Sequence, residues 1–289
     1  MKPWILGARP RTLAAAIAPV LVGTALAFPN GINLNWLNAL LALLVSLFLQ
    51  IGVNYANDYS DGIRGSDEIR VGPTRLVASG LKSAKSVKQA AFFLFFLAAV
   101  AGLFLALRTS RWLILVGVIA ILAAWNYTGG AKPYGYQGFG EISVFLFFGV
   151  VATSGSYFAQ SQKITWQSLL ISIPMGTLAC AILAINNLRD LPKDALVGKR
   201  TLAVRIGDSS ARAMITALIA TAIFAGLLAV SISPWVFSTL LIVPLAIRIS
   251  IEINQGAVGS GLVPLLGKTG KLQLFFALLM TFALFMARA

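Results

Sequence analysis

The chain has 289 residues, of which 58% are hydrophobic and only 11% are charged, and its mean hydropathy is +0.85. A soluble domain usually carries about 25% charged residues, so this composition excludes an ordinary water-soluble fold. The absence of His excludes His-ligated zinc or haem and Ser-His-Asp catalysis. The chain has one cysteine, Cys180, which excludes an internal disulfide and is interpreted as a small packing residue.

Nine largely uncharged apolar stretches follow one another along the chain. Most reach the roughly 17 to 25 residues that a membrane-spanning helix needs. Backbone amides find no water in hydrocarbon, and the stretches lack the alternation of a β-barrel, so each is predicted to be a helix. The predicted helices are residues 12–28, 36–55, 90–107, 111–128, 142–160, 166–186, 211–231, 234–251 and 272–287. The expected fold is therefore all-α: one polytopic membrane domain, residues 1–289, with nine transmembrane helices in one bundle.

Two of these assignments depend on local signals. The charge-free run 213–247 is too long for one helix, and Ser231, Ser233 and Pro234 mark the turn predicted to divide it. The first apolar run ends in the sequence Ala-Leu-Ala at residues 25–27, which is also typical of a signal peptide with its cleavage site. Pro19 inside the run favours a retained helix.

The distribution of charge predicts the orientation in the membrane. With a cytoplasmic amino terminus, most Lys and Arg fall in cytoplasmic segments: residues 2–11, 56–89, 129–141, 187–212 and 252–271. The other side holds only Arg108, Arg111, Lys163 and Arg288. The positive-inside rule thus accounts for the net charge of +14 without a nucleic-acid partner. All nine Asp and Glu residues also lie on the cytoplasmic side, which indicates a polar site that handles an anion through a cation.

A first acidic motif lies at the cytoplasmic end of the second predicted helix. Asn54, Asp58 and Asp61 stand at i, i+4 and i+7, so they share one helix face. Carboxylates held this close repel each other unless a cation lies between them, and oxygen ligands with substrate phosphates suit Mg²⁺. The alternative is that these acids merely solvate the end of a helix.

A second motif follows the sixth predicted helix, about 130 residues later. Asn186, Asp190 and Asp194 repeat the order of Asn before Asp at four-residue spacing, which suggests two related halves, about 1–128 and 129–289. The halves are expected to face each other across one cavity. Pro192 predicts that this helix is kinked or interrupted.

Basic residues follow both motifs, and Lys and Arg bind phosphate oxygens directly. The preferred phosphate ligands are Arg70, Arg75, Lys199 and Arg200, although a positive-inside loop charge explains each of them as well. A third loop, residues 127–136, is rich in Gly and Pro and is predicted to be tight and non-helical. Its Tyr and Lys residues are candidates for contact with a substrate, or else ordinary interfacial residues.

Taken together, these segments resemble the UbiA superfamily of intramembrane aromatic prenyltransferases, and most closely its members that act on 1,4-dihydroxy-2-naphthoate in menaquinone biosynthesis. The resemblance spans nearly the whole chain and rests on residues 9–12, 54–61, 65–67, 70–75, 127–136, 186–194 and 198–207. It implies transfer of a polyprenyl chain from polyprenyl diphosphate to the naphthoate at the plasma (inner) membrane, with loss of CO₂ and diphosphate.

The resemblance also implies roles for individual residues. The Mg²⁺ ligands it implies are Asp58, Asp61, Asp190 and Asp194, with Asp67 completing the first motif. The catalytic candidates are these acids with Lys132 and Tyr134. The substrate-binding candidates are Arg9, Asn54, Asn57, Arg70, Arg75, Tyr127, Asn186, Asn187, Lys199 and Arg200. The Phe-rich segments 92–96 and 145–148 either face lipid or line a lateral tunnel for the prenyl tail.

Other functions compete with this interpretation. Within the enzyme class, the alternative acceptors are 4-hydroxybenzoate, homogentisate, a haem and a phosphoribosyl group. A transporter of an anionic substrate also uses intramembrane carboxylates and broken helices. Against a transporter, the acids cluster at one face and none lies near mid-bilayer. A structural or assembly role leaves the paired spacing of Asn and Asp unexplained.

Overall fold

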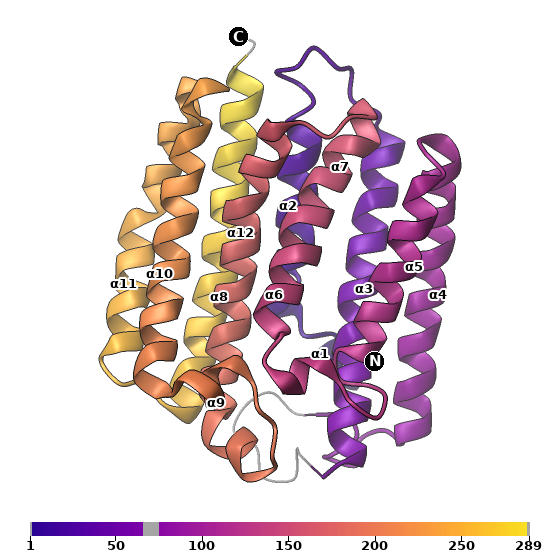
Figure 1. Ribbon diagram of the computed structural model, residues 1–289, viewed down its shortest axis with the longest axis vertical. Coiled ribbons are helices and arrows are strands. Elements are labelled where there is room, and N and C mark those ends of the chain that lie inside the picture. The colour runs from indigo at the N-terminus through magenta and orange to yellow at the C-terminus, as the bar shows by residue number, and fades with distance from the viewer. Residues whose placement is uncertain (1, 66–74, 288–289) are drawn as a thin grey trace.

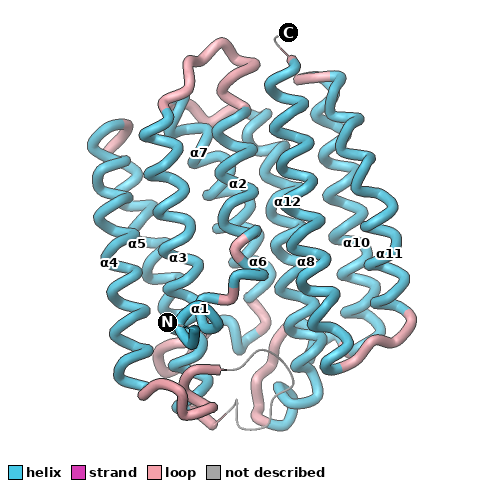
Figure 2. The backbone as a smooth tube through the Cα atoms, turned by 180° about the vertical axis from the view of Figure 1, so that it is seen from behind, coloured by secondary structure: helices cyan, strands magenta, loops and turns pink. Residues whose placement is uncertain are grey.

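The computed structural model describes residues 2–65 and 75–287, so Asp67 and Arg70 lie outside the described residues. Long helices run side by side along the molecule, and most loops gather at its two ends (Figures 1 and 2). The described residues contain no β-strand, which confirms the all-α prediction.

Long α-helices alternate with short ones along the chain. The α-helices are α1 Lys2–Ala8, α2 Ala14–Ala25, α3 Trp36–Ile63, α4 Ala84–Arg108, α5 Trp112–Asn126, α6 Gly140–Val144, α7 Ala152–Ser161, α8 Trp166–Leu196, α9 Leu202–Ile206, α10 Asp208–Leu227, α11 Val243–Asn254 and α12 Leu262–Met286. A π-helix, η3 Phe145–Val151, joins α6 to α7, and a 3₁₀ helix, η5 Pro234–Ile242, leads into α11. Short 3₁₀ turns lie at Pro10–Thr12, Tyr134–Gln137, Leu228–Ser231 and Gly259–Gly261.

Seven helical stretches within the described residues are long and apolar enough to cross a membrane. They are α3, α4, the stretch from α6 to α7, α8, α10 with its last turn, η5 with α11, and α12 with the turn before it. The α1–α2 pair passes the same test as one span bent by 53°, and α5 is a shorter apolar helix. The chain is therefore a multi-pass helical membrane protein, and all nine predicted stretches are helical.

The predicted turn near residue 233 is confirmed. Helix η5 begins at Pro234, and the Ser233 side chain caps it by accepting the backbone N–H of Trp235 at 3.3 Å. Proline at the first position of a helix loses no hydrogen bond there, so this is a favoured place for the second helix to begin.

Two predicted features differ from the structure. Helix α8 continues through Pro192 to Leu196, as it does through Pro174, so the predicted interruption does not occur: a proline removes one main-chain hydrogen bond, and the remaining bonds continue the helix. Helix α12 begins at Leu262, ten residues before the predicted start at 272. The predicted start followed Lys271, but α12 contains both Lys268 and Lys271, and Lys268 lies 2.6 Å from Glu252 of α11 and is neutralised there.

Two hydrophobic cores organise the bundle. The larger is built around α8, whose apolar window is 83% buried, with contributions from α2, α7, α10, α11 and α12. The smaller joins α3, α4 and α5 and includes Tyr55 and Phe95. Residues 25–27 of the first apolar run, including the fully buried Leu26, belong to the larger core. The space between the two cores positions the site.

Candidate functional site

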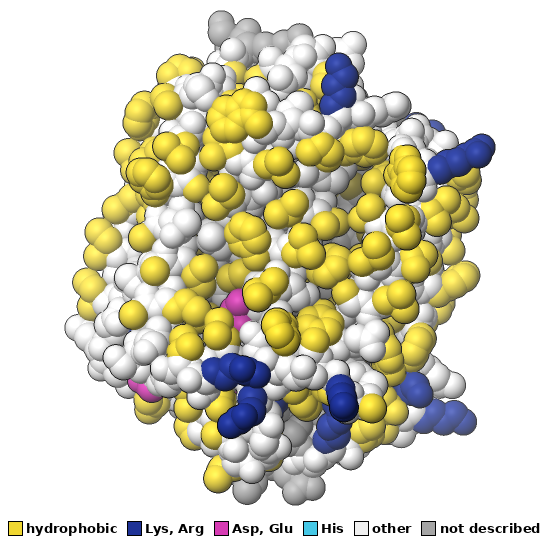
Figure 3. Space-filling model, viewed as in Figure 1, with side chains coloured by type: hydrophobic (Ala, Val, Ile, Leu, Met, Phe, Trp, Pro, Cys, Tyr) yellow, Lys and Arg dark blue, Asp and Glu magenta, His cyan; other side chains and the backbone are white. Residues whose placement is uncertain are grey.

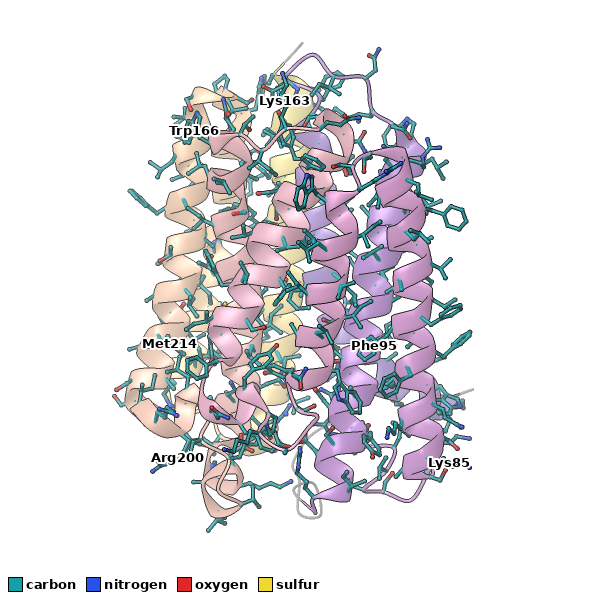
Figure 4. All side chains as sticks on the ribbon, turned by 45° about the vertical axis from the view of Figure 1, so that its right-hand side comes forward. Lys85, Phe95, Lys163, Trp166, Arg200 and Met214 are labelled. Atoms are coloured by element: carbon teal, nitrogen blue, oxygen red, sulfur yellow. The ribbon has the colours of Figure 1, made fainter. Side chains whose placement is uncertain are left out.

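Both acidic motifs lie at the same end of the bundle, where α3 ends at Ile63 and α8 ends at Leu196, and which we call the motif end. Figure 4 labels Arg200 at this end and Lys163 at the opposite end. Asn54, Asp58 and Asp61 occupy the last turns of α3, so they share a helix as the spacing predicts. Figure 3 shows Lys and Arg side chains gathered toward the motif end, below a largely hydrophobic flank.

Lys199 joins the two motifs. Its ammonium nitrogen lies 3.5 Å from a carboxylate oxygen of Asp61 and 3.9 Å from one of Asp194. Arg75 lies 3.5 Å from the other carboxylate oxygen of Asp61. The side chains of both acids are nearly buried, and charges attract more strongly in such surroundings than in water. The fold thus brings an acid of each motif to one point.

The loop between α5 and α6 closes over the first motif. The Tyr136 hydroxyl donates a hydrogen bond to Asp61, and the Lys199 ammonium lies 4.6 Å from the centre of the Tyr136 ring. Burial, together with the negative charge of Asp61, raises the pKa of Tyr136 above its ordinary range, so its hydroxyl stays protonated and keeps donating.

Arg64 fixes this loop in place. Its guanidinium donates hydrogen bonds to the backbone carbonyls of Thr128 and Gly130 and lies 5.2 Å from the centre of the Tyr136 ring. Tyr136 was predicted only as one of the Tyr residues of the 127–136 loop, as a candidate for substrate contact and not as a partner of Asp61. Arg64 was noted among the basic residues that follow the first motif but was not a preferred phosphate ligand.

Two of the predicted metal ligands make close contacts within the protein. Both carboxylate oxygens of Asp58 accept backbone N–H groups, from Leu76 at 3.0 Å and Val77 at 3.2 Å. Asp58 therefore anchors the chain where it returns to α3. Asp190 accepts two hydrogen bonds from Arg189, at 2.8 and 2.7 Å, in a bidentate pair.

The Asn residues of the first motif connect neighbouring segments. Asn54 donates to the carbonyl of Ala8 at 2.9 Å, where α1 ends, and Arg9 follows with a left-handed φ of 53°. A non-glycine residue in this conformation is uncommon and is stabilised by its surroundings. Asn57 accepts the hydroxyl of Thr128 at 2.7 Å, which ties α3 to the loop after α5.

In the second motif, Asn187 donates to a carboxylate oxygen of Glu141 at 2.9 Å. Glu141 is buried, at 7% exposure, near the start of α6, and its other carboxylate oxygen has no hydrogen-bond partner among the described residues. Glu141 was not a predicted site residue. Its signal in the sequence was a single acid directly before an apolar stretch.

Three other predicted site residues, Tyr134, Lys132 and Arg200, lie in different surroundings: the first is half-buried in the site and the other two are exposed. Tyr134 lies inside the site, where its hydroxyl is 2.9 Å from both the Ala123 carbonyl and the Ser143 hydroxyl, and burial raises its pKa. Lys132 is exposed and forms no ion pair with a carboxylate in residues 2–65 or 75–287. The exposed Arg200 contributes its backbone, which donates an N–H to the Tyr136 carbonyl at 2.9 Å.

A cavity of about 270 Å³ extends from the motifs into the bundle. Its polar end is lined by Arg9, Asn54, Asn57, Tyr127 and Asn186, all predicted to bind substrate. The rest of the wall is largely apolar and comes mainly from α2, α3, α4, α5, α6, α7, α8 and η3. The two Phe-rich segments separate: Phe147 and Phe148 line the cavity, whereas Phe92, Phe93 and Phe96 are exposed on the outer surface.

The donor set at the motif end is made of carboxylates and amides, the ligands that Mg²⁺ prefers. Within residues 2–65 and 75–287, no three Asp, Glu, Cys or His side chains lie close enough together to hold a metal ion by themselves. Asp61 and Asp194, one acid from each motif, have a cation between them in the form of Lys199. Their position therefore favours positive charge, which fits a divalent ion shared with a phosphate.

Comparisons with known proteins agree with this arrangement. Residues 16–261 match the model of the UbiA prenyltransferase family. The chain is 49% identical to the 1,4-dihydroxy-2-naphthoate octaprenyltransferase of Mycobacterium tuberculosis, over 97% of this chain and 96% of that protein, and 36% identical to the Escherichia coli protein of the same name, over 99% and 96%. Its fold is similar to that of a UbiA homologue from Archaeoglobus fulgidus bound to DMAPP and Mg²⁺, with a TM-score of 0.64, 18% identity and coverage of 98% and 99%.

Proposed function

This chain belongs to the UbiA prenyltransferase family, and from that premise we propose that it transfers a polyprenyl group from polyprenyl diphosphate to 1,4-dihydroxy-2-naphthoate. The products are demethylmenaquinone in its reduced, quinol form, CO₂ and diphosphate. The observation that carries the proposal is the meeting of Asp61, Asp194 and Lys199 near the polar end of an apolar cavity. A long isoprenoid fits the apolar part, and its charged head fits the polar end.

Mg²⁺ is the cofactor of the proposed reaction. Asp61 and Asp194 are the ligands best placed to hold it, with Asp58 and Asp190 beside them and Asp67 outside the described residues. When bound, Mg²⁺ supplies positive charge that favours departure of the diphosphate. The relatives support this assignment, because structures of the Archaeoglobus fulgidus homologue were determined with DMAPP or GPP and Mg²⁺.

The basic side chains of the site act on the leaving group. Lys199 and Arg75 lie beside the carboxylates and carry N–H donors that bind non-bridging phosphate oxygens. Their charge stabilises the diphosphate more strongly as the bond between C1 and oxygen breaks, which lowers the barrier. Arg70 is proposed to act in the same way. For Arg200 and Lys132, the exposed placement favours a role in attracting the anionic substrates.

The apolar wall protects the organic fragment. Ionisation leaves an allylic cation, and a cavity lined by groups such as Phe147 and Val144 excludes the water that would capture it. The electron-rich naphthoate ring then attacks C1, and loss of a proton and of CO₂ completes the reaction. Tyr127 and Tyr134 line the cavity near its polar end and are proposed to orient the acceptor.

The proposed topology has nine membrane spans, with α1–α2 as one bent span and α5 as a short one. The motif end faces the cytoplasm of a cell with the protein in its plasma (inner) membrane, because most Lys and Arg lie at that end. The chain is a single domain, and the repeated motif supports two related halves, about 1–128 and 129–289.

The test is direct assay. Purified protein in lipid nanodiscs is incubated with Mg²⁺, octaprenyl diphosphate and a panel of 1,4-dihydroxy-2-naphthoate, 4-hydroxybenzoate and homogentisate, and products are identified by mass spectrometry. A prenylated, decarboxylated naphthoate is expected. Product from another acceptor alone would change the assigned substrate. Uptake of a labelled anion into proteoliposomes without any prenylated product would instead favour the transporter.

A further inference from the structure

Three glycines on three different helices line the part of the cavity that lies away from the motif end: Gly102 of α4, Gly117 of α5 and Gly155 of α7. Gly117 precedes Tyr127, at the polar end, by ten residues, or about 15 Å at the rise of an α-helix. Gly155 lies one turn before Ala159, whose carbonyl accepts a hydrogen bond from Asn38 near the opposite end of α3. The glycines are therefore remote from the acidic motifs.

Most glycines inside the long helices of this bundle are explained by close packing. A Cβ added to Gly149 would lie 2.7 Å from the Cα of Gly176, and one added to Gly52 would lie 2.6 Å from the Phe95 ring. Small residues at such places let membrane helices approach each other. A Cβ at Gly117 or Gly155, in contrast, would meet no atom within 4 Å.

Neither position needs glycine for its backbone. Both lie inside α-helices, and neither is among the glycines with a positive φ. Glycine in a helix interior costs about 1 kcal/mol relative to Ala, so it is unfavourable without a compensating use. The compensating use in this fold is the empty volume that each glycine leaves at the wall of the cavity.

We propose that Gly117 and Gly155 set the length of the isoprenoid chain that the cavity accepts. This inference rests on the proposed prenyl transfer and deepens it by assigning the residues that select the donor. The neighbouring wall residues, including Leu113, Val116 and Val151, are apolar except Ser156, whose hydroxyl donates to the Ala152 carbonyl. An isoprenoid therefore gains no hydrogen bond there, and volume discriminates between chains. A short donor ends before the glycines, whereas a long one passes them.

The experiment compares donors of two lengths. Gly117→Phe and Gly155→Phe are assayed in nanodiscs with geranyl diphosphate and with octaprenyl diphosphate, at fixed Mg²⁺ and 1,4-dihydroxy-2-naphthoate. The ratio of kcat/KM for octaprenyl to that for geranyl diphosphate is expected to fall by at least about tenfold, because forcing bulk into an occupied apolar space is strongly unfavourable. Gly117→Leu and Gly155→Ala give smaller steps should a Phe variant fail to fold.

The matched control is Val118→Phe. Val118 is the next residue of α5, is 49% exposed and is absent from the cavity wall, so the same new ring faces outward and the ratio stays at the wild-type value. An unchanged ratio in the cavity variants, whether both donors react normally or both react less, overturns the inference. A wild-type protein that forms no product from either donor instead overturns the proposed function.

Discussion

Asp61 accepts the hydroxyl of Tyr136 and lies 3.5 Å from both Arg75 and Lys199. This environment separates its carboxylate from bulk water and surrounds it with groups that a phosphate or a metal ion would also engage. Asp194, on the other motif, shares Lys199 with it. At the scale of single residues, these two acids are the most direct test of the site.

Asp61→Asn and Asp194→Asn are expected to slow prenyl transfer by about 10²-fold or more, because each change removes a charge that stabilises the transition state while keeping the side-chain volume. Initial rates over a series of Mg²⁺ concentrations, with size-exclusion profiles, provide the measurement. Asp208→Asn is the control, since Asp208 also lies at the motif end but is exposed and pairs with Arg212. Wild-type rates for Asp194→Asn at every Mg²⁺ concentration would contradict its assignment.

The Tyr136→Phe substitution removes the hydroxyl and keeps the ring, so it tests the contribution of the hydroxyl alone. The folded protein raises the pKa of Tyr136, so its contribution to stability is constant below the unfolded value of about 10 and declines as the pH rises above it. Wild type and Tyr136→Phe are therefore expected to have pH–rate profiles of the same shape below about pH 9.5, with the variant slower throughout. The prediction fails if the wild-type profile has an alkaline limb in this range that the variant lacks.

The sequence predicted the acidic motifs but not all of their contacts. The spacing of Asn54, Asp58 and Asp61 predicts one helix face because helical periodicity is local. The hydrogen bonds of Tyr136 to Asp61 and of Asn187 to Glu141 join segments far apart in the chain. Such contacts depend on how helices pack, which residue spacing does not report.

At the scale of elements, bilayer thickness makes the apolar stretches easy to recognise, because each backbone polar group in hydrocarbon needs an internal partner. Helix ends are harder to predict. The predicted start of α12 followed Lys271, but the helix begins earlier and includes Lys268, which pairs with Glu252 on α11. Helix α8 passes through Pro192, as it does through Pro174, because its other main-chain hydrogen bonds continue. Hydropathy reports neither the ion pair nor the main-chain hydrogen bonds.

The contact between η3 and α8 gives a prediction at this scale. Gly149 of η3 packs on Gly176 of α8, so Gly149→Ala would force these helices apart and is expected to cost about 1–3 kcal/mol. Thermal unfolding in detergent, followed by circular dichroism, measures the loss. Gly155→Ala is the control, since an added methyl group meets no neighbour there. Equal melting temperatures for Gly149→Ala and wild type would show that the contact is not tight.

At the scale of the whole molecule, two cores flank one cavity. Hydropathy predicts how many stretches enter the membrane. Because it is similarly high in all of them, it does not predict which helices pack together. Helix α2 illustrates this: it lies early in the chain, yet it belongs to the core built around α8. The cavity follows from that arrangement. The repeated motif predicted that two halves face each other across one cavity, but hydropathy did not predict which helices line it.

The orientation of the molecule can be tested with cysteine labelling. The native Cys180 is 3% exposed, so Val197→Cys at the motif end and Ile164→Cys at the opposite end provide the reactive thiols. In right-side-out vesicles, a membrane-impermeant maleimide is expected to label Ile164→Cys and to spare Val197→Cys, with the reverse in inverted vesicles. The wild-type protein is the control. Labelling of Val197→Cys from outside would invert the proposed topology.

Without substrate, the side chain of Lys199 supplies the positive charge between the two acidic motifs. With its amine between Asp61 and Asp194, two acids from distant stretches of chain stay close without borrowing an ion from solution. In the proposed reaction, the diphosphate with its cations would take the place of the amine between the acids, and the flexible side chain of Lys199 would keep the amine within reach of the phosphate oxygens. The acids would then be neutralised by Lys199 before the substrate binds and by the substrate's cations afterwards.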